Sequence, residues 1–265
     1  MSKPKLIFVT VGTSAIDNCQ SAFPSKGNTQ TPVEAVSKKL RENKVTMEAA
    51  LLNSTPQTDE RNKSLVYNLQ RELPVFESSI GTGNMLNRSR KVSAEVASLL
   101  VMSKEPDIGA FGSKDEIHLI PSETEVGKVC AEANRIALQS RFPQAKIECT
   151  PPLEGVRFAG ESDEASLEKF RDSGLKQFEE IVKEKNAAFK KSYGSGVDDT
   201  LRILDVTGGF KGLILFAPIL CAEYVLMLYY FYQEAKRPIR FKAYDFRSRF
   251  EGANKPRDGN YSTGE

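Results

Sequence analysis

Two adjacent glycines, Gly208 and Gly209, stand between two apolar stretches and limit the local fold more than any other feature. The run Leu201–Leu204 before them is typical of a buried strand, and the stretch that begins at Leu213 is typical of a helix. A glycine turn between strand and helix lets backbone N–H groups approach a ligand closely, at a helix N-terminus that favours negative charge. Lys211 adds a positive charge. The turn therefore suits a phosphate, although its spacing matches neither GxxxxGKS/T nor GxGxxG.

A second turn of similar character follows the short apolar run Leu6–Val9. It reads Thr10-Val11-Gly12-Thr13-Ser14, so three hydroxyls surround a glycine. Hydroxyls and backbone amides can hold phosphate oxygens or ribose hydroxyls without adding charge. In an open parallel sheet, ligands bind outside the carboxyl ends of the strands, where the strand order reverses. Either turn alone could be an ordinary loop between strand and helix, but the pair predicts one ligand site if the two strands are neighbours.

Strand patterns alternate with helical patterns along most of the chain. Strands are predicted at 6–10, 116–120, 145–149, 201–206 and 239–244, and helices at 33–40, 59–69, 93–102, 125–140 and 164–191. This alternation is typical of an α/β, Rossmann-like fold, a mostly parallel sheet with helices on both faces. Ser122 and Glu125 have the spacing of a capping box for the helix at 125–140.

The composition is that of a soluble globular protein, since 40% of the residues are hydrophobic and 27% are charged. The net charge of +2 does not indicate a general polyanion binder, and stable DNA binding is not expected. Four scattered cysteines without zinc-ligand spacing indicate reduced thiols in a cytoplasmic protein, and we expect no signal peptide. The single histidine, His118, excludes a multi-histidine metal centre, and neither a metal nor a cofactor is expected.

The segment Leu213–Tyr232 is almost wholly apolar and reaches the length of a membrane span. Pro218 and Glu223 interrupt it, so a buried helix is favoured and no membrane association is expected. Its tyrosines also suit a subunit interface. The basic stretch 236–249 is interpreted as a charged edge strand, with a nucleic-acid contact as the minority alternative. We expect one domain over 1–250 and a polar tail or linker start at 251–265.

Both turns, together with a central segment, resemble the CARF family, the CRISPR-associated Rossmann-fold proteins. The first-strand motif is Phe8–Ser14, the central strand, turn and helix are His118–Gly127, and the late TGG-x-K-G turn is Asp205–Gly212. Ser93-Ala94-Glu95 also fits the family's helix before the central strand. The late turn is the most specific of these matches, which together extend over most of the chain.

The resemblance implies a homodimer that binds cyclic oligoadenylate, the ring of 3′–5′ linked adenylates made by type III CRISPR complexes in antiviral defence. Cyclic tetra-adenylate is the first candidate and cyclic hexa-adenylate the second, although the sequence does not settle the ring size. A ring of four phosphates has a twofold symmetry that matches an isologous interface. The resemblance places residues of both turns around the ring: Thr10, Gly12, Thr13 and Ser14 beneath it, and Thr207, Gly208, Gly209 and Lys211 closing over it.

Three other residues near the turns also have expected roles. Phe210 is expected to pack against the end of the sheet. Ser122 and Thr124 follow the central strand, so they either approach the ring or cap the helix that begins after them.

Three functions stay open. In the first, the protein is a metal-independent ring nuclease, in which a ribose 2′-OH attacks its own phosphate and leaves a 2′,3′-cyclic phosphate. Lys211 would stabilise the phosphorane, Ser14 or Thr13 would position the 2′-OH, and the lack of a histidine in either turn predicts a slow enzyme. In the second, the chain is a non-catalytic sensor domain of a larger CARF effector. In the third, it is an unrelated Rossmann-like nucleotide enzyme. A HEPN ribonuclease is excluded because no arginine stands at the required distance before His118.

Overall fold

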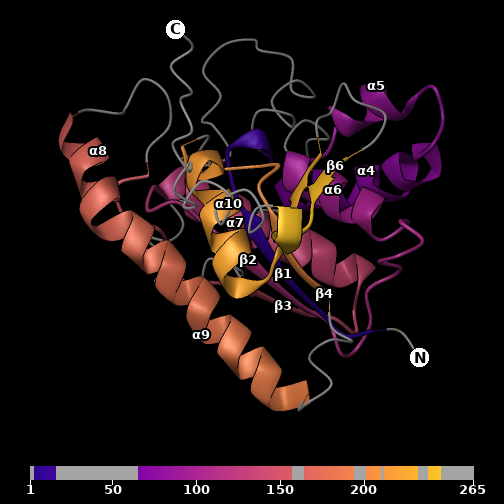
Figure 1. Ribbon diagram of the computed structural model, residues 1–265. Helices are drawn as coiled ribbons and strands as arrows, with labels where there is room; N and C mark the ends of the chain where they lie inside the picture. Colours follow the sequence, from indigo (N-terminus) through magenta and orange to yellow (C-terminus); the bar gives the residue numbers. More distant parts are fainter. Residues whose placement is uncertain are drawn as a thin grey trace, which may run out of the picture.

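The sheet that organises the fold has the strand order β3-β2-β1-β4-β5-β6, with β1 between β2 and β4 (Figure 1). The computed structural model describes residues 3–15, 65–156, 164–193, 201–209, 212–231 and 238–245. The strands are β1 Lys5–Thr10, β2 Glu116–Ile120, β3 Lys146–Cys149, β4 Leu201–Asp205, β5 Met227–Tyr230 and β6 Ile239–Phe241. Strands β1 to β5 run parallel, and β6 is antiparallel to β5. This strand order is that of the Rossmann fold, so the predicted fold class is confirmed.

Helices connect the parallel strands. Their bounds are α4 Leu65–Ser79, α5 Met85–Ser89, α6 Ala94–Met102, α7 Glu125–Arg141, α8 Glu164–Lys169, α9 Leu175–Tyr193 and α10 Leu213–Tyr224. A π-helical stretch, Phe170–Gly174, joins α8 to α9, and the three form the long helical rod in Figure 1. At the start of α6, the Ser93 hydroxyl accepts the Val96 N–H and satisfies a backbone donor that the helix leaves free.

The central strand β1 is buried on both faces, which explains why Leu6–Val9 is a continuous apolar run in the sequence. On one face, Ile7 and Val9 of β1 belong to a hydrophobic cluster that includes residues of α4, α6 and α7. On the other face, Leu6 and Phe8 belong to a cluster with residues of α9 and α10. Because successive side chains of a strand point to opposite faces, β1 supplies both cores. The predicted covering of both faces by helices is confirmed.

A buried ion pair closes the amino end of β1. The Lys5 Nζ lies 3.0 Å from Asp115 Oδ2, and the two side chains are 0% and 2% exposed. The ammonium also donates to the Ala110 carbonyl at 3.0 Å, while the Asp115 carboxylate accepts the N–H groups of Lys5 and Gly112 at 2.8 and 2.7 Å. Buried charges are tolerated when they are paired and hydrogen-bonded in this way. The amino end of the sheet is therefore sealed, and both glycine turns lie at the opposite end.

The apolar segment that begins at Leu213 differs from its prediction as one helix. Helix α10 ends at Tyr224, Val225 adopts a left-handed conformation with φ of 58°, and β5 begins at Met227. The strand went unpredicted because no polar or glycine residue separates it from the helix, and a short apolar run has no period of its own. Within the part of the chain that the structure describes, no helix has both the length and the apolar character needed to cross a bilayer.

The remaining predicted elements agree with the structure at their centres and differ at their ends. The helix predicted at 59–69 overlaps α4, which continues to Ser79. The strand predicted at 239–244 is shorter, because β6 ends at Phe241. The helix predicted at 33–40 and the tail at 251–265 lie outside the described residues.

Candidate functional site

The two glycine-containing turns lie side by side at the carboxyl ends of β1 and β4. These strands pair in parallel, with Val9 opposite Asp205. Beyond the last pair, the Thr10 hydroxyl donates a hydrogen bond to the Gly208 carbonyl of the other turn. The chain runs outward from β1 through β2 to β3 and then returns to β4 on the other side of β1. Open α/β sheets bind ligands at such a switch point, so the condition that the sequence set for a shared crevice is met.

Glycine is required at three positions, where an added side chain would collide with the other turn or with Glu95. A Cβ atom at Gly12 would lie 2.8 Å from the Gly209 nitrogen, and one at Gly209 would lie 2.8 Å from the Thr10 Cβ. Gly209 also has a φ of 87°, which residues with a side chain rarely adopt. A Cβ atom at Gly208 would collide with the carboxylate of Glu95. The turns are therefore in close contact along a seam between Gly12 and Gly209, and the side chains of Thr10 and Glu95 pack against the second turn.

A buried glutamate, Glu95 in the first turn of α6, ties the first turn to that helix. Its side chain is fully buried. Its Oε1 accepts the Gly12 N–H at 2.7 Å, and its Oε2 accepts the Ser14 O–H at 2.7 Å. The Ser14 Oγ in turn accepts the Ala94 N–H at 2.9 Å. The Gly12 N–H, which the sequence suggested as a phosphate donor, is therefore already matched with a carboxylate.

Sequence reasoning did not include Glu95 among the site residues. An acidic residue just after an N-cap serine is common in the first turn of a helix, where it favours the helix dipole from a solvent-exposed position. The pattern Ser93-Ala94-Glu95 gave no sign that the carboxylate is buried against Gly12 and Ser14. Only the contact between β1 and α6, distant in sequence, shows this role.

The second turn begins with polar groups that face the protein interior. The Thr207 N–H donates to Asp205 Oδ1 at 2.9 Å, and the Thr207 hydroxyl donates to Ser98 Oγ and accepts the Phe231 N–H. Burial raises the pKa of Asp205 to about 6, while the nearby Ser98 and Thr207 hydroxyls oppose the shift. Within the described residues, Asp205 Oδ2 and the Tyr229 hydroxyl have no hydrogen-bond partner. The Thr207 side chain is thus a structural part of the turn.

Ser122 and Thr124 follow β2, and the predicted helix cap is confirmed for Thr124 but not for Ser122. The N-cap of α7 is Thr124, whose hydroxyl accepts the Gly127 N–H at 3.1 Å. Ser122 is buried and shares a 2.8 Å hydrogen bond with the Thr124 hydroxyl. The capping box predicted with Ser122 is wrong because Ser122 forms a parallel bridge with Leu153 and stays extended before the helix begins.

The predicted ligand-binding residues differ in their exposure at the crevice. The half-buried ones are Thr13, Ser14, Thr207, Gly208 and Gly209, and the buried ones are Thr10, Gly12 and Ser122. Lys211 and Phe210 lie outside the described residues. The ligand-binding and catalytic roles of all these residues stay predictions.

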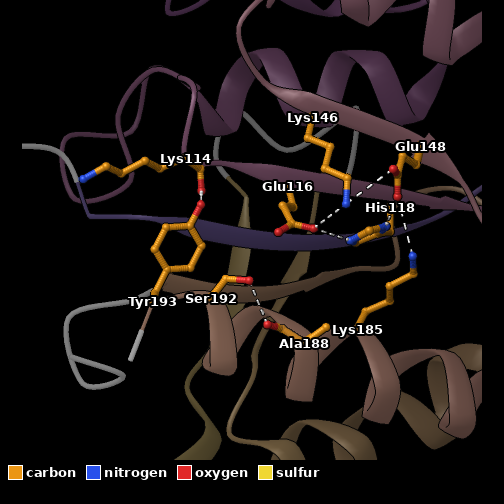
Figure 2. Close-up of polar contacts among 9 residues, drawn as sticks. All are labelled: Lys114, Glu116, His118, Lys146, Glu148, Lys185, Ala188, Ser192 and Tyr193. Atoms are coloured by element: carbon orange, nitrogen blue, oxygen red, sulfur yellow. Dashed lines mark hydrogen bonds and ion pairs between the residues drawn. The ribbon is translucent and has the colours of Figure 1, made fainter. Parts of the chain in front are cut away.

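A second polar cluster lies between the sheet and α9, where Figure 2 shows Glu116 and His118 of β2 beside Glu148 of β3 and Lys185 of α9. His118 is fully buried, with Nε2 3.4 Å from Glu116 and Nδ1 3.8 Å from Glu148. Burial and then the charge of Lys185 lower the pKa of His118 to about 4, although the two glutamates oppose the shift. The imidazole is therefore neutral near pH 7. The described residues contain no group of three or more His, Cys, Asp or Glu side chains that could hold a metal ion.

Comparison with protein families gives a match that includes every described strand except β1. The model of a CRISPR-associated protein family (Cas_APE2256) matches residues 90–241, more than half of the chain. The matched range runs from before α6 to the end of β6 and therefore includes Glu95 and the second glycine turn, whereas the first turn precedes it. No curated protein matches the chain.

Proposed function

Because the chain belongs to the CRISPR-associated protein family Cas_APE2256, we propose that it is a CARF protein that binds cyclic oligoadenylate in type III CRISPR signalling. Cyclic tetra-adenylate is the proposed ligand, held where the turns after β1 and β4 meet. The observation that supports this best is the seam between Gly12 and Gly209, which come so close that no side chain fits between them. A glycine-lined seam at the switch point of a parallel sheet suits a ligand rich in phosphates.

The half-buried residues on the two sides of the seam have suitable chemistry for such a ring. Thr13 and Ser14 supply hydroxyls on the β1 side, and Gly208 and Gly209 supply backbone groups on the β4 side. Hydroxyls and amides can recognise both phosphate oxygens and ribose hydroxyls. Lys211 follows Gly209 closely in the sequence and is the proposed cation for a phosphodiester.

A homodimer is part of the proposal because α10, which follows the second turn, presents apolar side chains to solvent. Leu215 is 77% exposed and Ile219 is 50% exposed, and residues four apart lie on the same face of a helix. Adjacent exposed aliphatic side chains of this kind mark interaction surfaces. A twofold contact along α10 would bring two copies of the second turn to one ring, which has the matching symmetry.

We further propose that the bound ring is cleaved slowly and without a metal. The ribose 2′-OH attacks the adjacent phosphorus, with Ser14 or Thr13 positioning the hydroxyl and Lys211 stabilising the charge that develops. The chain's histidine cannot act as the base, since His118 is buried on β2 between the sheet and α9. Without a histidine the rate is expected to be lower by ~10²–10⁴-fold than with a full acid–base pair.

The alternative is a non-catalytic sensor of cyclic oligoadenylate within a larger CARF effector. The hydrogen bonds of Thr10 and Thr207 favour this alternative, because both hydroxyls are engaged by protein groups rather than facing the crevice. In that case the turns recognise the shape and charge of the ring but supply no group that helps the 2′-OH to react. A sensor would bind the ring tightly and release it intact.

Incubation of the protein with labelled cyclic tetra-adenylate in the presence of EDTA separates these functions. The ring-nuclease proposal predicts linear products that end in a 2′,3′-cyclic phosphate, formed at a rate that the chelator does not change. Binding without cleavage, even with protein in excess, would instead support the sensor. Failure to bind either cyclic tetra-adenylate or cyclic hexa-adenylate would contradict both.

Replacing Lys211 tests the proposed cation. Lys211→Ala is expected to weaken binding of cyclic tetra-adenylate by about tenfold or more, because a hydrogen bond to a charged group contributes about 1.5–3 kcal/mol. Cleavage should fall by at least as much. The matched control is Lys183→Ala, since Lys183 is an exposed lysine of α9 and should leave both quantities unchanged. Equal behaviour of the two variants would remove Lys211 from the site.

A further inference from the structure

The Ser14 hydroxyl has a fixed direction, because two protein groups already occupy it. It donates its proton to Glu95 Oε2 at 2.7 Å and accepts the Ala94 N–H at 2.9 Å. A hydroxyl has one proton to donate and two lone pairs. One lone pair therefore remains, so that Ser14 can accept a hydrogen bond from a ligand but cannot donate one while Glu95 holds its proton. Ser14 is half-buried, so the residue keeps part of its surface at the carboxyl end of the sheet.

The contacts of Glu95 are those of a carboxylate. Its two oxygens face two donors, the Gly12 N–H and the Ser14 O–H, and an ionised carboxylate is a pure acceptor. Both donors are neutral. A negative charge fully buried beneath a site for a polyanion is unfavourable for binding, because like charges repel strongly where water is excluded. The side-chain amide of a glutamine could hold the turn in place without that repulsion. The negative charge therefore has to be explained by something other than the hydrogen bonds to the turn.

We propose that Glu95 is a positioning residue that makes Ser14 an acceptor for the ribose 2′-OH and takes up the proton through Ser14. This inference rests on the proposed ring-nuclease function. As the 2′-O–P bond forms, the 2′-OH proton moves to Ser14 Oγ and the Ser14 proton moves to Glu95 Oε2. The P–O5′ bond breaks, and the leaving 5′-oxygen takes a proton from water. Glu95 then returns its proton through Ser14 to solvent, so the products are a 2′,3′-cyclic phosphate and a 5′-hydroxyl with no net change in protons.

Such a relay supplies the base that neither turn contains. Proton transfer to a positioned base contributes ~10²–10⁴-fold to the rate of a reaction of this kind. The base need not touch the substrate when a single hydroxyl connects them, and the Ser14 Oγ lies within hydrogen-bond distance of the carboxylate. The Ser14 hydroxyl is bonded to a carboxylate side chain, whereas the Thr10 hydroxyl of the same turn is bonded to the Gly208 carbonyl.

The test is Glu95→Gln in the full chain, measured by single-turnover cleavage of cyclic tetra-adenylate over a range of pH. Glutamine keeps the size of the side chain, its carbonyl can accept the Gly12 N–H, and its amide can donate to Ser14 Oγ. We expect the dissociation constant of the ring to be unchanged within about threefold or to fall, because a negative charge is removed. Cleavage should fall by ~100-fold or more. A loss of cleavage without a loss of ring binding distinguishes proton transfer from a structural brace.

Two further variants separate this relay from a purely structural brace. Ser14→Ala should lose cleavage to the same extent as Glu95→Gln, and the double variant should lose no more than either single one, because both changes interrupt one path. Ser14→Ala also tests the relay if Glu95→Gln does not fold. The control Glu72→Gln changes an acid of α4 to its amide and should cleave at the wild-type rate.

The outcomes distinguish the inference from the function on which it rests. Wild-type cleavage by Glu95→Gln, or additive losses in the double variant, would overturn the relay and leave the ring nuclease standing. A wild-type protein that binds the ring but never cleaves it would overturn both the relay and the ring nuclease in favour of the sensor.

Discussion

The two ends of β1 bury charged side chains in opposite ways. At the amino end, Lys5 and Asp115 cancel each other's charge, and each also bonds to backbone groups. At the carboxyl end, the described partners of the Glu95 carboxylate are a backbone N–H and a hydroxyl, both neutral. The neighbouring Asp205 is also fully buried and has one oxygen without a partner among the described residues.

The difference supports the proposal that the amino end of the sheet serves stability and the carboxyl end serves function. A fully paired ion pair can be buried with little net loss, whereas uncompensated buried charge lowers the stability of the fold. Local departures from good packing and full hydrogen bonding are expected at functional sites. The carboxyl end has acidic groups in excess, a glycine with positive φ and backbones in direct contact. The comparison therefore supports placing the binding site there.

The largest effect on stability is expected at the amino end. Lys5→Met would leave Asp115 buried without its cation and should lower the free energy of unfolding by about 3–5 kcal/mol. The affinity for cyclic tetra-adenylate, measured where the variant is still folded, should not change. Denaturant unfolding measures the first quantity. The control is Lys114→Met at an exposed position, where a change within about 0.5 kcal/mol is expected. Equal stability of the two variants would contradict the role of the amino end of β1 in stability.

Asp205 gives a smaller effect that depends on pH. Its pKa of about 6 in the folded protein is above the ordinary value of 3.8, so the folded state holds this proton more tightly than the unfolded state. Its contribution to stability is therefore full below about pH 4 and is lost as the pH rises through about 6. Asp205→Asn should gain stability over the wild type across that window, by at most about 3 kcal/mol. Unfolding curves at several pH values measure this, and a difference that stays constant would contradict it.

Gly208→Ala should have the smallest effect on stability and a clear effect on binding. The added Cβ meets the Glu95 carboxylate, which can shift only by disturbing its bonds to the first turn, so we expect a loss of about 1–2 kcal/mol. Ring binding should weaken by about tenfold or more, because a small displacement of positioning groups has large consequences. Gly83→Ala is the control, since nothing lies within 4 Å of its added Cβ. Unchanged ring binding in Gly208→Ala would show that the ring does not bind at the seam.

Much of the fold could be predicted from the sequence because the central strands are mostly buried. The runs at Leu6–Val9, Glu116–Ile120 and Leu201–Leu204 are mostly apolar, and polar turns bound them. β5 could not be found in this way, since no polar residue separates it from α10. The antiparallel direction of β6 also has no local signal, because it depends on which edge of the sheet the chain reaches.

The candidate site could be predicted only in part, for a related reason. Glycines and hydroxyls at the ends of two strands are visible in the sequence, and their meeting follows from a parallel sheet. The carboxylate that connects Gly12 and Ser14 comes from a helix more than eighty residues away in the chain. The contacts of Glu95 with Gly12 and Ser14 depend on tertiary packing, and so does the inward direction of the Thr207 hydroxyl.

Calorimetric titration of the wild-type protein with cyclic tetra-adenylate tests most directly whether the seam between β1 and β4 is a ring-binding site shared by two copies of the chain. The account predicts saturable binding with one ring for every two chains. Absence of binding, or one ring for each single chain, would contradict it.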